Sequence, residues 1–177
     1  MSYQLLSHIP SPSLGAANDE GFSYLYELKD SVASQKLFDN IQPATAAAGR
    51  TDYRVLYVRN ATTFTLLGVK AYINSQTSSA DTSAQIGLGL KAAFLPTQIA
   101  SQQYEAVNNT CELAIADTVT APAGVSFVDA ATLGTAISLG DIPAGYLKAI
   151  WVKRVVNAGA AATTSDTMSI RITNGVA

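Results

Sequence analysis

The chain of 177 residues is poor in cysteine, histidine and charged side chains. It has one cysteine, Cys111, and one histidine, His8, and only 14% of its residues are Asp, Glu, Lys or Arg. A single cysteine excludes an internal disulfide, and zinc sites depend on Cys and His ligands, so we expect neither. Soluble domains usually carry about 25% charged residues. A surface with so few charges is weakly protected against association, so we expect contacts with copies or partners.

Positive clusters and long apolar runs are also missing. The net charge is −2, and Lys and Arg do not gather in any stretch. A nucleic-acid groove or an anionic membrane surface needs concentrated positive charge, so we expect neither partner. No window approaches the roughly 20 apolar residues of a membrane-spanning helix. The start, MSYQLLSHIPSP, does not resemble a signal peptide, and we expect synthesis in the cytoplasm.

No constellation of catalytic residues is visible. His8 stands alone in a turn-rich segment, and Cys111 has no second histidine to activate it, so we interpret Cys111 as a small packing residue. The GLGLK stretch lies inside a strand pattern, and its lysine is misplaced for a phosphate loop. We therefore expect no enzyme activity, no cofactor and no metal. The scattered acids lack calcium-loop spacing and are interpreted as solvated turn residues: Asp19, Glu20, Asp81, Asp129, Asp141 and Asp166.

What the chain does contain is a series of short strand patterns with turn signals between them. β-branched and aromatic residues alternate with other residues, which predicts strands. NATT at 60–63 predicts a turn. Leu67, Val69, Ala71 and Ile73 are expected on one face, and Gly87 and Gly89 on a face that another backbone approaches closely. The fold class is therefore all-β, an Ig-like or jelly-roll-like antiparallel β-sandwich. The expected strands lie within 51–60, 64–74, 82–92, 120–130, 133–142, 146–156 and 166–173.

The domain organisation that we expect is an arm followed by the sandwich. Residues 1–50 form an N-terminal arm and leading segment, and 51–177 form the sandwich, with an irregular or short helical excursion at about 93–119. Either the chain's own domain or a neighbouring chain holds the arm in place. We expect residues 1–21 to contact another subunit by adding a strand to an exposed sheet edge. The interface candidates in the arm are Tyr3, Leu5, Leu6 and Ile9.

The longest strand pattern, 146–156, is apolar on both faces through its middle. We therefore expect it to be covered on both sides. One interpretation is a central core strand whose cations reach the rim along their apolar stems. The other is that a second subunit covers one face, with Trp151 and Arg154 as interface candidates, because Trp and Arg are enriched among interface hot spots.

Two segments carry a resemblance to a known group of proteins. They are YRVLYVRNATTFTLLGVKAYINSQ at 53–76 and LGDIPAGYLKAIWVKRVVNAGAAATTSDTMSIRI at 139–172, together with TAPAGVSF at 120–127. This order resembles Ig-like sandwich modules and, more narrowly, is similar to small structural proteins of tailed bacteriophages. The resemblance covers about 51–92 and 120–174. It implies a virion component of the decoration or cement type and carries over no binding residue.

The functional hypothesis is therefore a structural protein of a bacteriophage virion, made in the host cytoplasm. It is expected to stabilise the head lattice through its arm and a sandwich edge, as a homo-oligomer or as lattice-bound copies on the major capsid protein or other virion proteins. One alternative is a tail, neck or baseplate protein. Another is a module that binds a carbohydrate or host surface, which needs exposed aromatic residues gathered at one end of the sandwich; Tyr72, Tyr104 and Tyr146 are the candidates.

Overall fold

The computed structural model describes most of the sandwich and parts of the leading segment. The described residues are 3–8, 26–29, 37–38, 40–93, 115, 117–163 and 166–174. None of the described helices is long and apolar enough to cross a membrane. The elements are β1 (Tyr3–His8), β2 (Tyr26–Lys29), α1 (Pro43–Ala48), β3 (Arg50–Asn60), β4 (Leu66–Ser75), β5 (Thr82–Leu88), β6 (Phe127–Val128), the 3-10 helix η3 (Leu133–Thr135), β7 (Ile137–Ile142), β8 (Leu147–Val156) and β9 (Ser169–Thr173).

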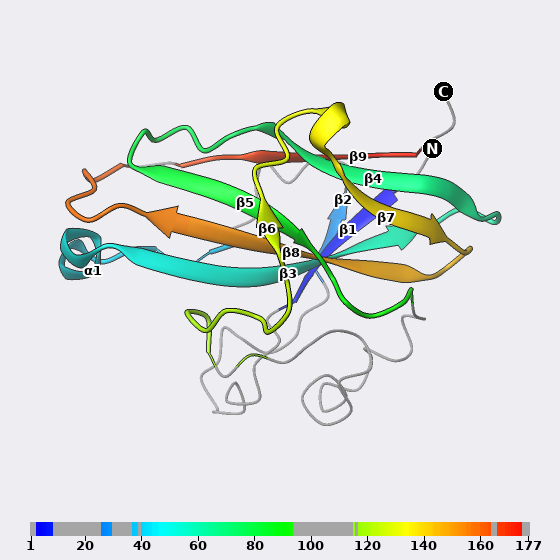
Figure 1. Cartoon of the computed structure of the whole chain (residues 1–177), viewed down its shortest axis with the longest axis horizontal. Helices are drawn as coiled ribbons and strands as arrows, with labels where there is room; N and C mark the ends of the chain where they lie inside the picture. The colour runs from blue at the N-terminus through cyan, green and yellow to red at the C-terminus, as the bar shows by residue number, and fades with distance from the viewer. Residues whose placement is uncertain are drawn as a thin grey trace.

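The strands form two antiparallel sheets. The larger sheet has the order β2-β1-β3-β8-β5-β6, and the smaller has the order β7-β4-β9. In Figure 1 the long strands β3, β8 and β5 run side by side along the molecule. The all-β sandwich predicted from the alternating patterns is confirmed. β1 and β2, which the sequence placed in the leading segment, are strands of the larger sheet.

The main core lies between the sheets and follows the period-two alternation of the strands. β3 contributes Leu56 and Val58, and β8 contributes Ile150 and Val152, all 0% exposed. From the opposite sheet, β4 and β7 contribute the other large set of buried residues: Leu66, Val69, Ala71, Ile73, Leu139 and Ile142. Ile170 and Ile172 of β9, together with Met168 just before this strand, pack against this core but stay half-buried.

A second apolar cluster covers the outer face of the larger sheet. Tyr57, Ala149 and Trp151 belong to it, and Ile115 packs on them from outside the strands. β8 is therefore covered on both faces, as predicted. Its cations do not simply reach the rim. Lys148 is only 8% exposed, and its Nζ donates hydrogen bonds to the carbonyl oxygens of Gly89, at 3.0 Å, and Lys91.

The close backbone approach predicted for β5 is confirmed at Gly87. A Cβ at this position would lie 2.6 Å from Cγ1 of Val125 and 2.9 Å from the carbonyl oxygen of Ser126. The predicted extent of this strand is wrong, because β5 ends at Leu88 rather than near residue 92. Beyond that point Leu90 is 52% exposed. Most of the predicted excursion at 93–119 lies outside the described residues.

The predicted face of Leu67 is wrong. Leu66 is 1% exposed and lies in the core, whereas Leu67 is 52% exposed. The pairing with β7 shifts register between Leu66 and Val69, and Gly68 lies between them with φ of +57°. Such a bulge inserts an extra residue and reverses the alternation beyond it. The N–H of Gly68 donates to Oδ1 of Asp141 at 2.8 Å, which holds the bulge.

The predicted turn after β3 is confirmed and is organised by Asn60, which is 0% exposed. The Nδ2 of Asn60 donates to the carbonyl oxygens of Phe64, at 2.7 Å, and Ile142, at 2.8 Å. Its Oδ1 accepts from the N–H and the hydroxyl of Thr62. Every polar atom of this buried side chain is therefore used to fix the turn.

Candidate functional site

The candidate site is the edge of β3 that faces away from β8. Over residues 55–60 this edge pairs with β1 in an antiparallel register that runs from His8 opposite Val55 to Tyr3 opposite Asn60. Further along, the N–H of Tyr53 donates to the carbonyl oxygen of Thr118 at 2.7 Å. Two segments remote in sequence therefore close one sheet edge in succession.

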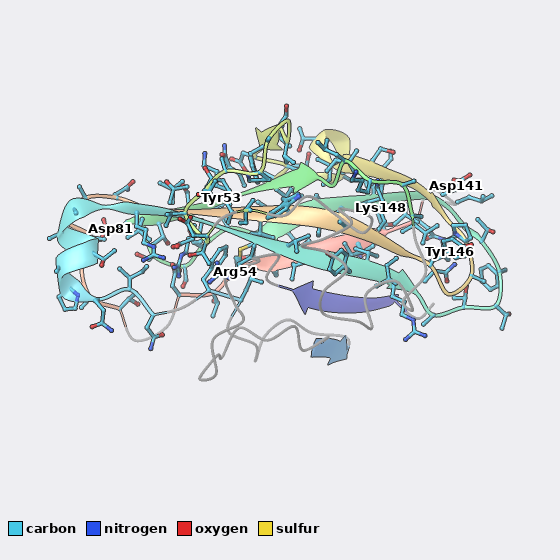
Figure 2. All side chains as sticks on the ribbon, turned by 90° about the horizontal axis from the view of Figure 1, so that it is seen from below. Tyr53, Arg54, Asp81, Asp141, Tyr146 and Lys148 are labelled. Carbon is cyan, nitrogen blue, oxygen red and sulfur yellow. The ribbon has the colours of Figure 1, made fainter. Side chains whose placement is uncertain are left out.

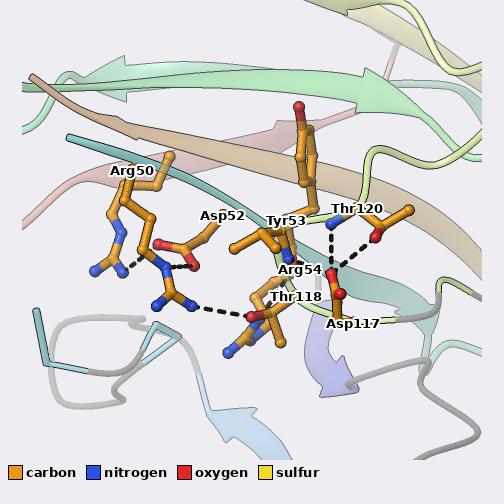
Figure 3. Close-up of polar contacts among 9 residues, drawn as sticks. Arg50, Asp52, Tyr53, Arg54, Asp117, Thr118 and Thr120 are labelled. Atoms are coloured by element: carbon orange, nitrogen blue, oxygen red, sulfur yellow. Dashed lines mark hydrogen bonds and ion pairs between the residues drawn. The ribbon is translucent and has the colours of Figure 1, made fainter. Parts of the chain in front are cut away.

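The turn at 117–120 is held by the carboxylate of Asp117. Oδ1 accepts hydrogen bonds from the N–H groups of Val119, at 2.9 Å, and Thr120, at 2.7 Å, and from the Thr120 hydroxyl at 2.8 Å. The Thr120 hydroxyl bond, followed by the Val119 N–H bond, lowers the pKa of Asp117 below the ordinary value of an aspartate. Figure 3 shows these bonds beside the start of β3.

A buried carboxylate joins this turn to the neighbouring strand. Asp52 is 1% exposed, and Arg154 lies opposite it on β8. The Nε of Arg50 lies 2.6 Å from Oδ1 of Asp52, and Nη2 of Arg154 lies 2.6 Å from Oδ2. Arg50 also donates from Nη2 to the hydroxyl of Thr118 at 3.2 Å. We call Arg50, Asp52 and Arg154 the ion-pair cluster; Arg50 and Asp52 are labelled in Figure 3.

Phe38 attaches the leading segment to the body next to this cluster. Its ring centroid lies 4.5 Å from Cζ of Arg154 and 5.7 Å from Cζ of Arg54, within the range of cation–π interactions. Leu37 and Phe38 also pack against the main core. The chain is therefore anchored at 37–38 before it enters α1 and β3.

Figure 2 shows Tyr53, Arg54 and Asp81 toward one end of the sandwich, and Asp141, Tyr146 and Lys148 toward the other.

The interface residues predicted in the arm lie on this edge. Tyr3, Leu5 and Leu6 lie in β1, opposite residues 57–60 of the same chain. Ile9 lies outside the described residues. Of the two explanations for what holds the arm, β1 shows pairing with the chain's own domain. Contact of residues 1–21 with another subunit stays a prediction.

The two candidates in the long strand are placed inside the molecule. Trp151 is 0% exposed within a single chain, and the side chain of Arg154 is 15% exposed and paired with Asp52. Side chains enclosed by their own domain offer little area to a partner, and contact of either residue with another subunit stays a prediction. The core interpretation accounts for Trp151, and the ion-pair cluster accounts for Arg154.

The residues considered for other chemistry are dispersed. His8 lies at the end of β1, opposite Val55, and Cys111 lies outside the described residues. No group of three or more His, Cys, Asp or Glu able to hold a metal occurs in the described part of the chain. Asp81 and Asp166 accept backbone N–H bonds from Ala161 and Ser79, consistent with turn residues.

The tyrosines considered for carbohydrate binding are not gathered where the structure describes them. Tyr146 lies in the turn before β8, close to the point where Leu66 pairs with Ile142. Tyr72 lies six residues along β4 from Leu66, which corresponds to about 20 Å of strand. Tyr104 lies outside the described residues.

Sequence reasoning missed the ion-pair cluster, the Phe38 anchor and the Asp117 turn. A signal was present in RTDYR, where Arg50, Asp52 and Arg54 occupy alternate positions of a strand that otherwise reads as buried. Charges repeated at i, i+2 and i+4 share one face of a strand, so they needed an internal partner.

Compared with family models, with curated proteins and with solved structures, the chain gave no match in any of the three. Function is therefore inferred from the fold, from the β3 edge and from the resemblance carried by the strand segments.

Proposed function

We propose that the chain is a non-catalytic structural protein of a bacteriophage virion, a decoration or cement protein that binds and stabilises the head lattice. The observation that carries this proposal is the closure of the β3 edge by β1, an N-terminal strand separated from β3 by more than 40 residues of chain. Strand addition joins protein segments through main-chain hydrogen bonds and needs no catalytic group.

The fold suits attachment to a repeating lattice. The larger sheet carries a two-stranded extension, β2-β1, on one side of its central strands. An arm and a sheet edge of this kind can clamp adjacent capsid proteins and resist the outward pressure of packaged DNA. Many modest contacts on a lattice raise the effective affinity of each copy. The low proportion of charged residues, 14%, favours such close association.

Two motifs of the phage resemblance form one packing unit. Val125 and Phe127, from TAPAGVSF, pack against the cluster that contains Ala149 and Trp151, from the Trp strand. Gly87 completes the contact by allowing the backbone at 125–126 to approach β5. The resemblance thus involves residues that touch each other, which supports a shared structural module rather than two unrelated similarities.

The test is to locate the chain in assembled particles of the phage that encodes it. Particles are purified on a density gradient, and the copy number of the chain relative to the major capsid protein is measured by quantitative mass spectrometry. We expect the chain in the particle band at a fixed ratio that follows the head lattice, with antibody labelling over the heads. Recovery only in the unassembled fractions would overturn the proposal. Labelling of tails or baseplates at low copy number would instead assign the chain to the tail or baseplate.

A further inference from the structure

Among the described residues, the strand pair β1–β2, called here the β1–β2 hairpin, joins the body through the ladder between β1 and β3. β1 pairs with β3, and β2 pairs with β1. The main contacts between the two sheets join β4 and β7 to β5 and β8. The hairpin therefore lies outside the part of the larger sheet on which the smaller sheet is chiefly packed, and main-chain pairing along residues 55–60 is its described attachment.

The edge that receives β1 is fixed independently of β1. β3 pairs with β8 over ten residues, from Arg50 opposite Val156 to Arg59 opposite Leu147. Its side chains are buried on both faces, with Leu56 and Val58 in one cluster and Val55 and Tyr57 in the other. The edge of β3 at residues 55–60 can therefore pair with any strand of matching register.

The connection to the body has a defined anchor and a defined length. Leu37 and Phe38 are packed on the body, and residues 30–36 connect β2 to them. A connection of this length spans at most roughly 25–30 Å when extended. Neighbouring strands in a sheet are only about 4.8 Å apart, so this reach covers the β3 edge of an adjacent copy standing edge to edge.

From this arrangement we propose that the β1–β2 hairpin is exchanged between copies, so that β1 of one chain pairs with residues 55–60 of β3 in its neighbour. The proposal rests on the proposed function and names a second copy of the chain as the partner at that site. Exchange of an identical element replaces each main-chain bond with an equivalent one, and reciprocal exchange closes a two-fold dimer. High local concentration on a lattice favours the exchanged form.

The experiment places cysteines at Gln4 and Arg59, which face each other in the β1–β3 register. Opposite residues in an antiparallel ladder have Cα atoms about 4.5–5.5 Å apart, within the range of a disulfide. Gln4→Cys and Arg59→Cys are made on separate chains in a Cys111→Ser background. The two chains are mixed, unfolded, refolded together at a series of concentrations and oxidised. Only exchange between copies brings the two cysteines together.

We expect disulfide-linked heterodimers on a non-reducing gel, in a proportion that rises with protein concentration. The matched control replaces Arg59→Cys with Gln85→Cys, because β5 lies three strands from β1, about 14 Å away, and should give no specific dimer. Two results together would overturn the exchange. In the first, a chain that carries both Gln4→Cys and Arg59→Cys forms only intrachain disulfides. In the second, the mixed single variants form no more linked dimer than the control.

Wild-type chain supplies a second readout that needs no cysteine. Light scattering after size exclusion should show a dimer that is lost when residues 1–29 are deleted, while far-UV circular dichroism reports that the shortened chain remains folded. A wild-type monomer at every concentration also overturns the exchange. If the chain joins the particle band but shows no exchange, only the exchange proposal is overturned. If the chain exchanges its hairpin but never joins particles, only the proposed virion role is overturned.

Discussion

The substitution Asp52→Asn tests the physical account of the β3 start most directly. The carboxylate is 1% exposed and lies 2.6 Å from both Arg50 and Arg154. The amide keeps the shape of the side chain but removes the negative charge, so two guanidinium groups are left facing each other. Removing one partner of a buried ion pair destabilises a protein by about 3–5 kcal/mol.

The expected loss lies at the lower end of that range. The side chains of Arg50 and Arg154 are 32% and 15% exposed, so water partly solvates both cations in the variant. We therefore expect a decrease of about 3 kcal/mol in the free energy of unfolding. With a urea m value of about 2 kcal/mol per molar, the unfolding midpoint falls by about 1.5 M.

Urea unfolding followed by Trp151 fluorescence measures this change. Trp151 is the only tryptophan and is fully buried, so its emission shifts when the sandwich opens. Far-UV circular dichroism on the same samples checks that both probes report one transition. Asp129→Asn is the matched control, because it removes the same charge from an exposed side chain and should change the free energy of unfolding by less than about 0.5 kcal/mol.

A double-mutant cycle separates the ion pair from other effects of the substitution. Arg154→Met, added to Asp52→Asn, removes one of the two stranded cations, so the second loss should be smaller than the loss that Arg154→Met causes alone. If Asp52→Asn unfolds within 0.5 kcal/mol of the wild-type chain at an unchanged m value, the ion-pair cluster does not stabilise this end of the sandwich and the reasoning is refuted.

Three other substitutions test separate parts of the structure. Gly87→Ala should lower the free energy of unfolding by about 1–3 kcal/mol, because its Cβ would lie 2.6 Å from Cγ1 of Val125. In the control Gly134→Ala, the nearest atom to the new Cβ lies at 3.7 Å, so the free energy of unfolding should hardly change. Equal effects of the two substitutions would contradict the close approach at Gly87. Asp117→Asn should remove a pH-dependent contribution to stability. Because the pKa of the carboxyl is lowered in the folded state, its stabilisation is present above the unfolded pKa of about 3.9 and is lost as pH falls through the lower folded pKa. In urea titrations, the difference in unfolding free energy between wild type and variant should therefore shrink between about pH 5 and pH 2, and a constant difference would contradict this role of the carboxylate. Lys148→Met should cost about 2 kcal/mol and speed hydrogen exchange just after β5, because two backbone carbonyls lose their ammonium donor; unchanged exchange there would contradict it.

The body of the sandwich could be predicted because its strands obey a local rule. β3 and β8 alternate with period two, and the apolar content of both faces of β8 indicated that it is covered on two sides. Gly87 in β5 had a similarly local meaning, since a strand position without a side chain allows another backbone to approach.

The remaining features depend on contacts between segments that are far apart in the sequence, and no local pattern contains them. Asp52 and Arg154 are 102 residues apart in sequence, and they meet only because β3 and β8 pair in one particular register. Leu67 alternates correctly in the sequence but is turned outward by a bulge that Asp141, from another strand, helps to hold. The end of β5 at Leu88 likewise follows from contacts beyond the strand itself, since Lys148 bonds the carbonyl oxygens of Gly89 and Lys91.

Among the described residues, the two halves of the β3 edge are closed by different kinds of bond. At the start of β3 the edge is closed by side chains as well as main chain: Arg50 binds both Asp52 and Thr118, and Asp117 fixes the turn that carries Thr118. Displacing that turn would break the hydrogen bond from Arg50 to the Thr118 hydroxyl as well as the main-chain bond from Tyr53 to Thr118. Along residues 55–60 the described closure is a main-chain ladder to β1. A strand of another copy restores such a ladder in full, so the proposed exchange concerns the half of the edge that β1 pairs with.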